Sequence, residues 1–174
     1  MSQTARMSRH LLLIALLAVL PLAPGLADPI HAAADGAYWH HGSGWTFPEI
    51  VGRFARIGIP QDVAGSEDAV AHYARVENGM RNTASVDVYQ AASAAAGELE
   101  ARSGSEVSGT VLALSATRGL SAKREVHDAG KPSMIATYFI DAGEWRIRIR
   151  ITGASLEAMD EFVRGQRWET LGSH

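Results

Sequence analysis

The chain has 174 residues, a formal net charge of −3 and no cysteine. The lack of cysteine excludes disulfide bonds, thiol catalysis, cysteine-ligated metal centres and the acylated cysteine of a lipoprotein. The mildly acidic composition argues against nonspecific nucleic-acid binding, which depends on clustered Lys and Arg side chains.

The N-terminus has the three parts of an export signal. Arg6 and Arg9 carry positive charge, an apolar run follows, and small residues precede a cleavage position after Ala27. The run is shorter than the roughly 20 apolar residues of a membrane-spanning helix. We therefore expect a signal peptide at residues 1–27, a periplasmic or secreted bacterial protein, and no membrane span after cleavage. Ala34 offers a second cleavage position.

Cleavage after Ala27 leaves 147 residues with 14 basic and 19 acidic side chains, a formal charge of −5. That length suffices for one domain with a hydrophobic core. Residues 28–44 are rich in Ala, Gly and His, which predicts a flexible segment before the domain. The single domain is expected to span residues 45–174.

The first half of the domain carries patterns that are typical of strands. Residues 53–59 predict one strand. Residues 70–76 and 84–88 alternate with a period of two, so one parity of each faces the core. Asn78-Gly79 between them marks a turn, which predicts a β-hairpin.

The middle of the chain changes period. Residues 91–102 are mostly alanine and other good helix formers. Ser103 and Glu106 are spaced as a capping box. Three apolar residues then recur at helical spacing, at Val107, Val111 and Leu114. With Gly119 as a terminator, this stretch predicts a central helical segment.

The last third predicts an antiparallel meander followed by a helix. Residues 123–127, 133–140 and 145–152 are strand candidates, separated by two four-residue turns with glycine in third place. Ser155 then fits a helix N-cap. The helix has an apolar stripe for the core, formed by Leu156, Met159, Phe162 and Val163.

These elements together predict an α+β fold. An antiparallel sheet of about six strands is expected to carry the central helical segment and a C-terminal helix. On the last helix, Asp160 and Arg164 are spaced for an outward ion pair. Trp168, just past its end, is expected to return to the core.

Trp45-x-Phe47-Pro48 opens the domain, before the early hairpin, the central helix, the meander and the last helix. This segment and this order of elements resemble the PsbP-like sandwich and assorted exported bacterial proteins with no assigned function. The resemblance spans most of the chain after residue 27. It implies a fold that docks partners or small ligands, usually without catalysis, and it assigns no functional residue.

Three arginines form the sharpest local pattern. Arg146, Arg148 and Arg150 alternate with apolar residues, so they project from one face of a strand about 7 Å apart. Guanidinium groups in a row can bind a carboxylate or phosphate, or dock an acidic partner. Alternatively, they pair with acids on neighbouring strands, such as Asp87 or Glu125.

Histidines are the candidates for metal binding. His31, His40 and His41 lie in the segment that precedes the domain, and imidazole binds zinc and copper. Adjacent residues of an extended chain point in opposite directions, so His40 and His41 cannot readily share one ion. His72 and His127 are single strand histidines, which is typical of structural groups.

No catalytic or cofactor motif stands out, and no cofactor is expected. A hydrolase built from Ser121 or Ser133 with His127 is the remaining catalytic arrangement. The sequence favours an exported, non-catalytic domain that binds a partner protein or a small anionic ligand through its arginines, with no nucleic-acid partner. A small periplasmic hydrolase and a metal-handling protein stay open as alternatives.

Overall fold

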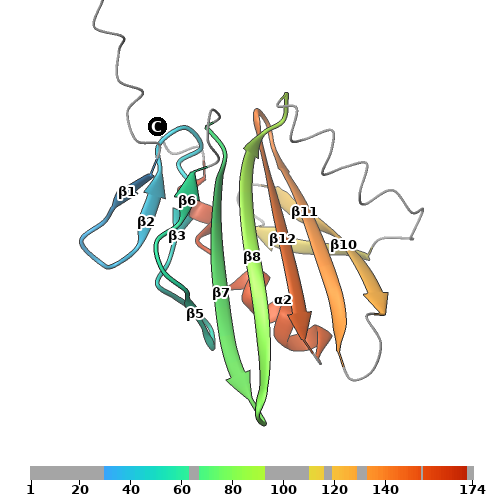
Figure 1. The fold of residues 1–174 in the computed structure, drawn as a ribbon. Coiled ribbons are helices and arrows are strands. Elements are labelled where there is room, and N and C mark those ends of the chain that lie inside the picture. Colours follow the sequence, from blue (N-terminus) through green and yellow to red (C-terminus); the bar gives the residue numbers. More distant parts are fainter. Residues whose placement is uncertain are drawn as a thin grey trace, which may run out of the picture.

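The computed structural model of the chain describes residues 30–62, 67–92, 110–115, 119–128, 133–153 and 155–171 (Figure 1). The predicted signal peptide at residues 1–27 lies outside the described residues, and so does much of the predicted central helical segment, residues 93–109.

The strands form two antiparallel sheets. The strands of the small sheet are β1 (Ile30–Ala32), β2 (Tyr38–His40) and β3 (Thr46–Phe47), paired in that order. The strands of the large sheet are β4 (Ile50–Val51), β5 (Phe54–Arg56), β6 (Gln61–Asp62), β7 (Ala69–Glu77), β8 (Met80–Gln90), β9 (Thr110–Ser115), β10 (Leu120–Asp128), β11 (Met134–Ala142) and β12 (Trp145–Gly153). Their order is β4-β5-β7-β8-β12-β11-β10-β9, and β6 pairs with β7.

The described residues are mostly strand, so the predicted α+β fold with a central helical segment is wrong. Their only α-helix is α2 (Leu156–Arg164), which a short 3₁₀ helix, η1 (Trp168–Thr170), follows. Residues 110–115, predicted to be helical, form β9 at the edge of the large sheet. Val111 is 70% exposed and Leu112 is buried, as in a strand. Pairing with β10 supplies the backbone hydrogen bonds and overrides the helical spacing.

The early hairpin is confirmed, and its connection is shorter than the gap between the predicted strands at residues 70–76 and 84–88. Strands β7 and β8 pair from Ala69–Val88 to Glu77–Met80, so only two residues connect them. Asn78 and Gly79 both have positive φ, at 51° and 74°. A two-residue turn with both residues in this region matches the right-handed twist of the flanking strands.

The late meander is also confirmed, because β10, β11 and β12 pair consecutively. The long-range partner of β12 is β8, and their register places residues 83–90 beside residues 145–152. This pairing joins the early hairpin and the meander into one continuous sheet (Figure 1).

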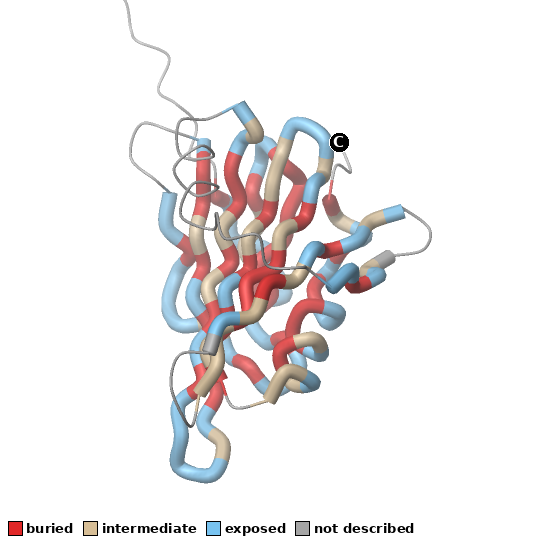
Figure 2. Tube along the Cα trace, turned by 90° about the vertical axis from the view of Figure 1, so that its right-hand side faces the viewer, coloured by how far each residue is buried: buried red, intermediate tan, exposed pale blue. Residues whose placement is uncertain are grey.

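The core lies between one face of the large sheet and α2. Along the strands, buried residues alternate with more exposed ones (Figure 2). The inner face of β12 contributes Ile147, Ile149 and Ile151, all fully buried, and α2 contributes Met159 and Phe162. Fully burying side chains of this size contributes about 1.5–3 kcal/mol each. Packing therefore holds α2 against the sheet.

The last helix begins where the sequence predicts. The Ser155 hydroxyl accepts a hydrogen bond from the Ala158 backbone N–H at 3.4 Å. The predicted outward ion pair with Arg164 is wrong, because Asp160 turns toward the sheet. Its carboxylate accepts hydrogen bonds from Arg124 Nη1 at 2.9 and 2.7 Å and from the Tyr138 hydroxyl at 2.7 Å. Both partners lie on the inner face of the meander, which α2 covers.

Residues 30–44, part of the segment predicted to be flexible, carry β1 and β2. They contribute Ile30 to the core, and the following β3 contributes Phe47. Trp168 is buried, as predicted, and its ring centroid lies 4.9 Å from that of Trp45. In the part of the chain that the structure describes, no helix has the length and apolar character to cross a membrane.

Candidate functional site

The three arginines of β12 lie where the sequence predicts. Ile147, Ile149 and Ile151 are fully buried on the inner face, so the alternating arginines occupy the outer face of the sheet. Their surroundings differ, because each lies beside different residues of β8 and β11.

Arg148 is neutralised by a cross-strand partner. It lies opposite Asp87 of β8, and its Nε donates to Asp87 Oδ2 at 3.2 Å. Each of these two side chains is 20% exposed, and the Ser85 hydroxyl also donates to Asp87 at 3.5 Å. The alternative of pairing with a neighbouring acid is therefore confirmed for Arg148 and Asp87. Glu125, the other predicted acid, pairs with Lys123 at 3.2 Å.

Arg146 lies in a mixed environment. Its register partners are Tyr89 on β8 and Asp141 on β11. It lines a cavity of about 330 Å³ together with Lys123, Glu125 and both of these residues. Two basic and two acidic side chains share this cavity, so its charges do not favour an anion.

Arg150 has a different setting. It is exposed and lies opposite Ser85 on β8 and Thr137 on β11. It lines an open groove of about 350 Å³ on the outer face of the sheet, which we call the arginine groove. The other residues that line it are Ile57, His72, Tyr73, Arg81, Thr83, Ala84, Ser85 and Thr152.

The strand register builds the arginine groove. One row across β7, β8 and β12 contains His72, Ser85 and Arg150, and the next row pairs Thr83 with Thr152. Arg81 lies four residues before Ser85 on β8, on the same face.

The polar groups of the arginine groove are mostly hydrogen-bond donors. Two guanidinium groups, one imidazole and the hydroxyls of Thr83, Ser85 and Thr152 line it, whereas the buried Tyr73 hydroxyl donates to the Pro48 carbonyl. No acidic side chain is among its described residues. Within the described part of the chain, neither Arg81 nor Arg150 forms an ion pair. Unlike the cavity beside Arg146, this groove therefore fits an anionic group.

His72 and Arg81 could not be assigned to this site from the sequence. Their alternation shows which face of a strand they share, but not which strand lies beside them. The pairing of β8 with β12 decides this, and it joins residues about 60 positions apart. The one local signal was Arg81 itself, a basic residue two positions after the Asn78-Gly79 turn.

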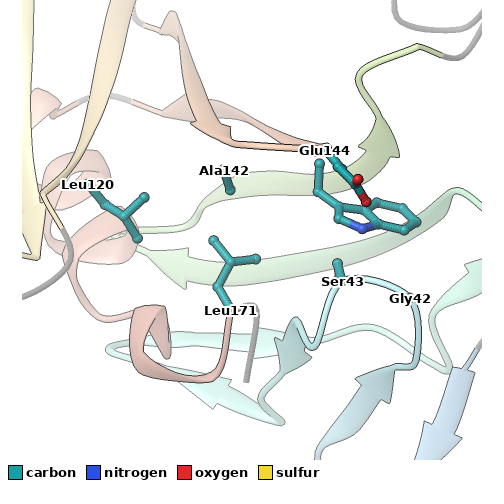
Figure 3. A pocket seen from close by; sticks show the side chains of 7 residues that line it. Gly42, Ser43, Leu120, Ala142, Glu144 and Leu171 are labelled. Atoms are coloured by element: carbon teal, nitrogen blue, oxygen red, sulfur yellow. The ribbon is translucent and has the colours of Figure 1, made fainter. Parts of the chain in front are cut away.

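A second cavity, of about 470 Å³, lies at one end of the large sheet (Figure 3). Leu120, Ala142, Trp145 and Leu171 form its apolar part, and Ser43, Gly42 and Glu144 complete the lining. A Cβ atom at Gly42 would lie 2.6 Å from the Trp145 ring, so glycine is needed there for the indole to keep its place.

The structure separates His40 from His31 and His41, the other two candidates for a metal site. His40 is fully buried, with Nδ1 at 2.8 Å from the Ser43 hydroxyl and Nε2 at 2.6 Å from the Glu67 carbonyl oxygen. Burial lowers the pKa of His40, so its ring stays neutral. Because a carbonyl only accepts, Nε2 donates and Nδ1 accepts, and neither nitrogen is left for a metal. His31 and His41 instead lie exposed on the other face of the hairpin.

Of the predicted hydrolase pairs, the structure separates Ser121 from His127. Ser121 and His127 lie six residues apart on β10, about 20 Å along the strand. No hydrogen bond among the described residues joins His127 to Ser121 or to Ser133.

A serine–histidine hydrogen bond does exist elsewhere, between Ser43 and His40. Ser43 is 1% exposed, and its hydroxyl also accepts from the Trp45 backbone N–H at 3.0 Å. The Ser43 backbone N–H donates to His40 Nδ1 at 3.2 Å. These contacts lock a four-residue turn and leave no exposed nucleophile.

Comparisons with protein-family models, with curated proteins and with solved structures found no match to this chain.

Proposed function

We propose that the protein is an exported, non-catalytic domain that binds an acidic segment of a partner protein in the arginine groove. The observation that carries the proposal is the contrast along β12. Arg148 is neutralised by Asp87, whereas Arg150 shares an open groove with Arg81 and His72 and with no described acidic side chain. Exposed guanidinium groups without an acidic neighbour are available to bind carboxylates.

The form of the groove favours a protein segment over a small anion. Arg81 lies about 13 Å along the strand direction from the row that contains Arg150, which matches carboxylates about four residues apart on an extended peptide. Exposed apolar side chains adjoin the basic ones, with Ile57 45% exposed and Val76, opposite Arg81, 75% exposed. A mixture of arginine and apolar surface is typical of protein interfaces.

The net charge supports selectivity. After removal of residues 1–27 the chain carries a formal charge of −5. An acidic partner is therefore repelled by most of the surface and attracted at the arginine groove. This fixes where and in which orientation it docks.

The test is capture of the partner from the native envelope extract by the mature protein. The double variant Arg81→Gln/Arg150→Gln removes both charges without adding acids. Arg164→Gln is the matched control, because Arg164 is exposed on α2, which packs against the opposite face of the sheet. We expect one partner to be retained by wild type and by Arg164→Gln, and to be lost by the double variant and in high salt.

The magnitude is also predicted. A hydrogen bond to a charged group contributes about 1.5–3 kcal/mol, so each arginine should account for at least about tenfold in affinity. A partner that the double variant retains as well as wild type does would overturn the proposal.

A further inference from the structure

The β1–β2 hairpin presents three aromatic rings on its exposed face. His31 and Trp39 lie directly opposite each other on the two strands, and His41 follows Trp39 by two residues. Ile30 and His40, of the opposite parity, are buried beneath them. Period-two alternation thus separates His40 from its neighbour and brings His41 close to His31.

The distance between these two imidazoles suits a shared metal ion. Their ring centroids are 6.2 Å apart, and the ring planes are at 89°. Metal–nitrogen bonds of about 2.0–2.1 Å place an ion about 3 Å from each ring centroid, so two ligating rings lie about 5–6 Å apart. A small rotation of either side chain closes the difference.

We propose that His31 and His41 form a two-imidazole site for a divalent transition metal, Cu²⁺ above all. Imidazole is a preferred ligand of copper and zinc, and Cu²⁺ binds nitrogen ligands most tightly of the first-row divalent ions. No group of three or more His, Asp or Glu that could hold a metal occurs among the described residues. Among the described residues the ligand set is therefore two imidazoles, as suits an exchangeable ion rather than a structural one.

The hairpin holds its two ligands in place. On its buried side His40 is fixed by Ser43 and by the Glu67 carbonyl. Its turn is closed by hydrogen bonds from the Ala33 and Ala37 backbone N–H groups, to the Ala37 carbonyl at 2.8 Å and to the Asp35 side chain at 3.1 Å. The imidazoles are thus supported by a backbone that is already ordered, which reduces the entropic cost of binding an ion between them.

The fluorescence of Trp39 can report on binding of the ion. Its ring centroid lies 6.1 Å from that of His31 and 5.2 Å from that of His41. A paramagnetic Cu²⁺ ion bound between the two histidines would lie within a few ångströms of the indole and quench its fluorescence.

The test is titration of the tag-free mature protein with Cu²⁺ alone, followed by tryptophan fluorescence and calorimetry. We expect one saturable site that quenches part of the fluorescence, with two nitrogen ligands in the electron paramagnetic resonance spectrum. Because two linked ligands bind far more tightly than either alone, His31→Gln and His41→Gln should each weaken binding by about a hundredfold. The double variant His72→Gln/His127→Gln, which changes two exposed strand histidines, is the matched control.

Of the four positions changed in these variants and in the control, only His72 lines the arginine groove, so His127→Gln alone is measured as well. Unchanged thermal unfolding shows that each variant is folded. Binding by His31→Gln at wild-type strength, or an equal loss in the His72→Gln/His127→Gln control, would overturn the site.

Discussion

The buried His40 side chain makes the stability of this protein depend on two hydrogen bonds. His40 is fully buried, yet both of its ring nitrogens have partners, one in its own turn and one at Glu67, 27 residues away. An imidazole with both nitrogens hydrogen-bonded in this way stabilises the fold only while it is neutral. In the charged form Nδ1 carries a proton and can no longer accept a hydrogen bond.

The pKa of His40 is lowered from its ordinary value of 6.5, chiefly by burial. Below pH 6.5 the unfolded chain therefore binds a proton that the folded protein resists, and the free energy of unfolding falls as the pH falls. The slope reaches at most about 1.4 kcal/mol per pH unit, until the lowered pKa is reached.

Urea unfolding at several pH values between 7.5 and 5 checks this prediction. We expect the His40→Asn variant to be less stable overall but to lose stability less steeply as the pH falls. The His127→Gln variant serves as the control and should keep the wild-type slope. Equal slopes for wild type and His40→Asn would rule out His40 as the cause.

The sequence predicts which face of β12 the three arginines occupy, but not which of them has an acidic partner. Alternation with isoleucine places all three on the outer face. Whether a given arginine is neutralised depends on the residue opposite it, which is Asp87 for Arg148 and Ser85 for Arg150. That choice is made by a register between distant segments, which leaves no local pattern.

Helix α2 is held on the sheet by one polar cluster as well as by its apolar face. Asp160 accepts from Arg124 and from Tyr138, and the Arg124 and Asp160 side chains are 16% and 14% exposed. Burial, together with the bond to Asp160, raises the pKa of Tyr138, so its hydroxyl stays protonated and donates. Losing the shared carboxylate would leave a largely buried guanidinium without its partner.

We therefore expect Asp160→Ala to lower the free energy of unfolding by about 2–4 kcal/mol. Tyr138→Phe removes one neutral donor and should cost about 1 kcal/mol. Glu157→Ala, an exposed position of the same helix, should stay within about 0.5 kcal/mol of wild type. Urea denaturation of the three variants measures the differences, and equal losses for Asp160→Ala and Glu157→Ala would refute this role.

The elements that the sequence predicts correctly are those with short connections. The hairpin around Asn78-Gly79 and the meander of residues 123–152 pair with their chain neighbours, and turn residues mark their ends. Residues 110–115 are the opposite case. Their apolar spacing is compatible with a helix, and only the edge of β10 makes them a strand.

For the whole molecule, the small sheet bears on where the expected signal peptide ends. Cleavage after Ala34 would remove β1, which pairs with β2 and buries Ile30. Cleavage after Ala27 keeps it. We expect the exported protein to begin at Asp28, as checked by its intact mass and N-terminal sequence. An N-terminus at residue 35 would mean that the mature protein lacks β1 and the proposed His31 ligand.

The overall architecture was the least predictable property. The pairing of β8 with β12 unites two locally predictable units into a nine-stranded sheet, and it brings Arg81 and His72 of the early hairpin into one groove with Arg150. Long-range strand pairing is decided by the packing of a whole face rather than by any short segment. The candidate site therefore appears only once the sheet is assembled.

The arginine groove is tested most directly by nuclear magnetic resonance of the arginine Nε–H groups during titration with a glutamate-rich peptide. We predict the largest shifts at Arg81 and Arg150, none at Arg164, and their loss at about 1 M salt, where the Debye length is about 3 Å. Shifts that are largest at Arg164, or none at Arg81 and Arg150 at low salt, would contradict an acidic-partner site in this groove.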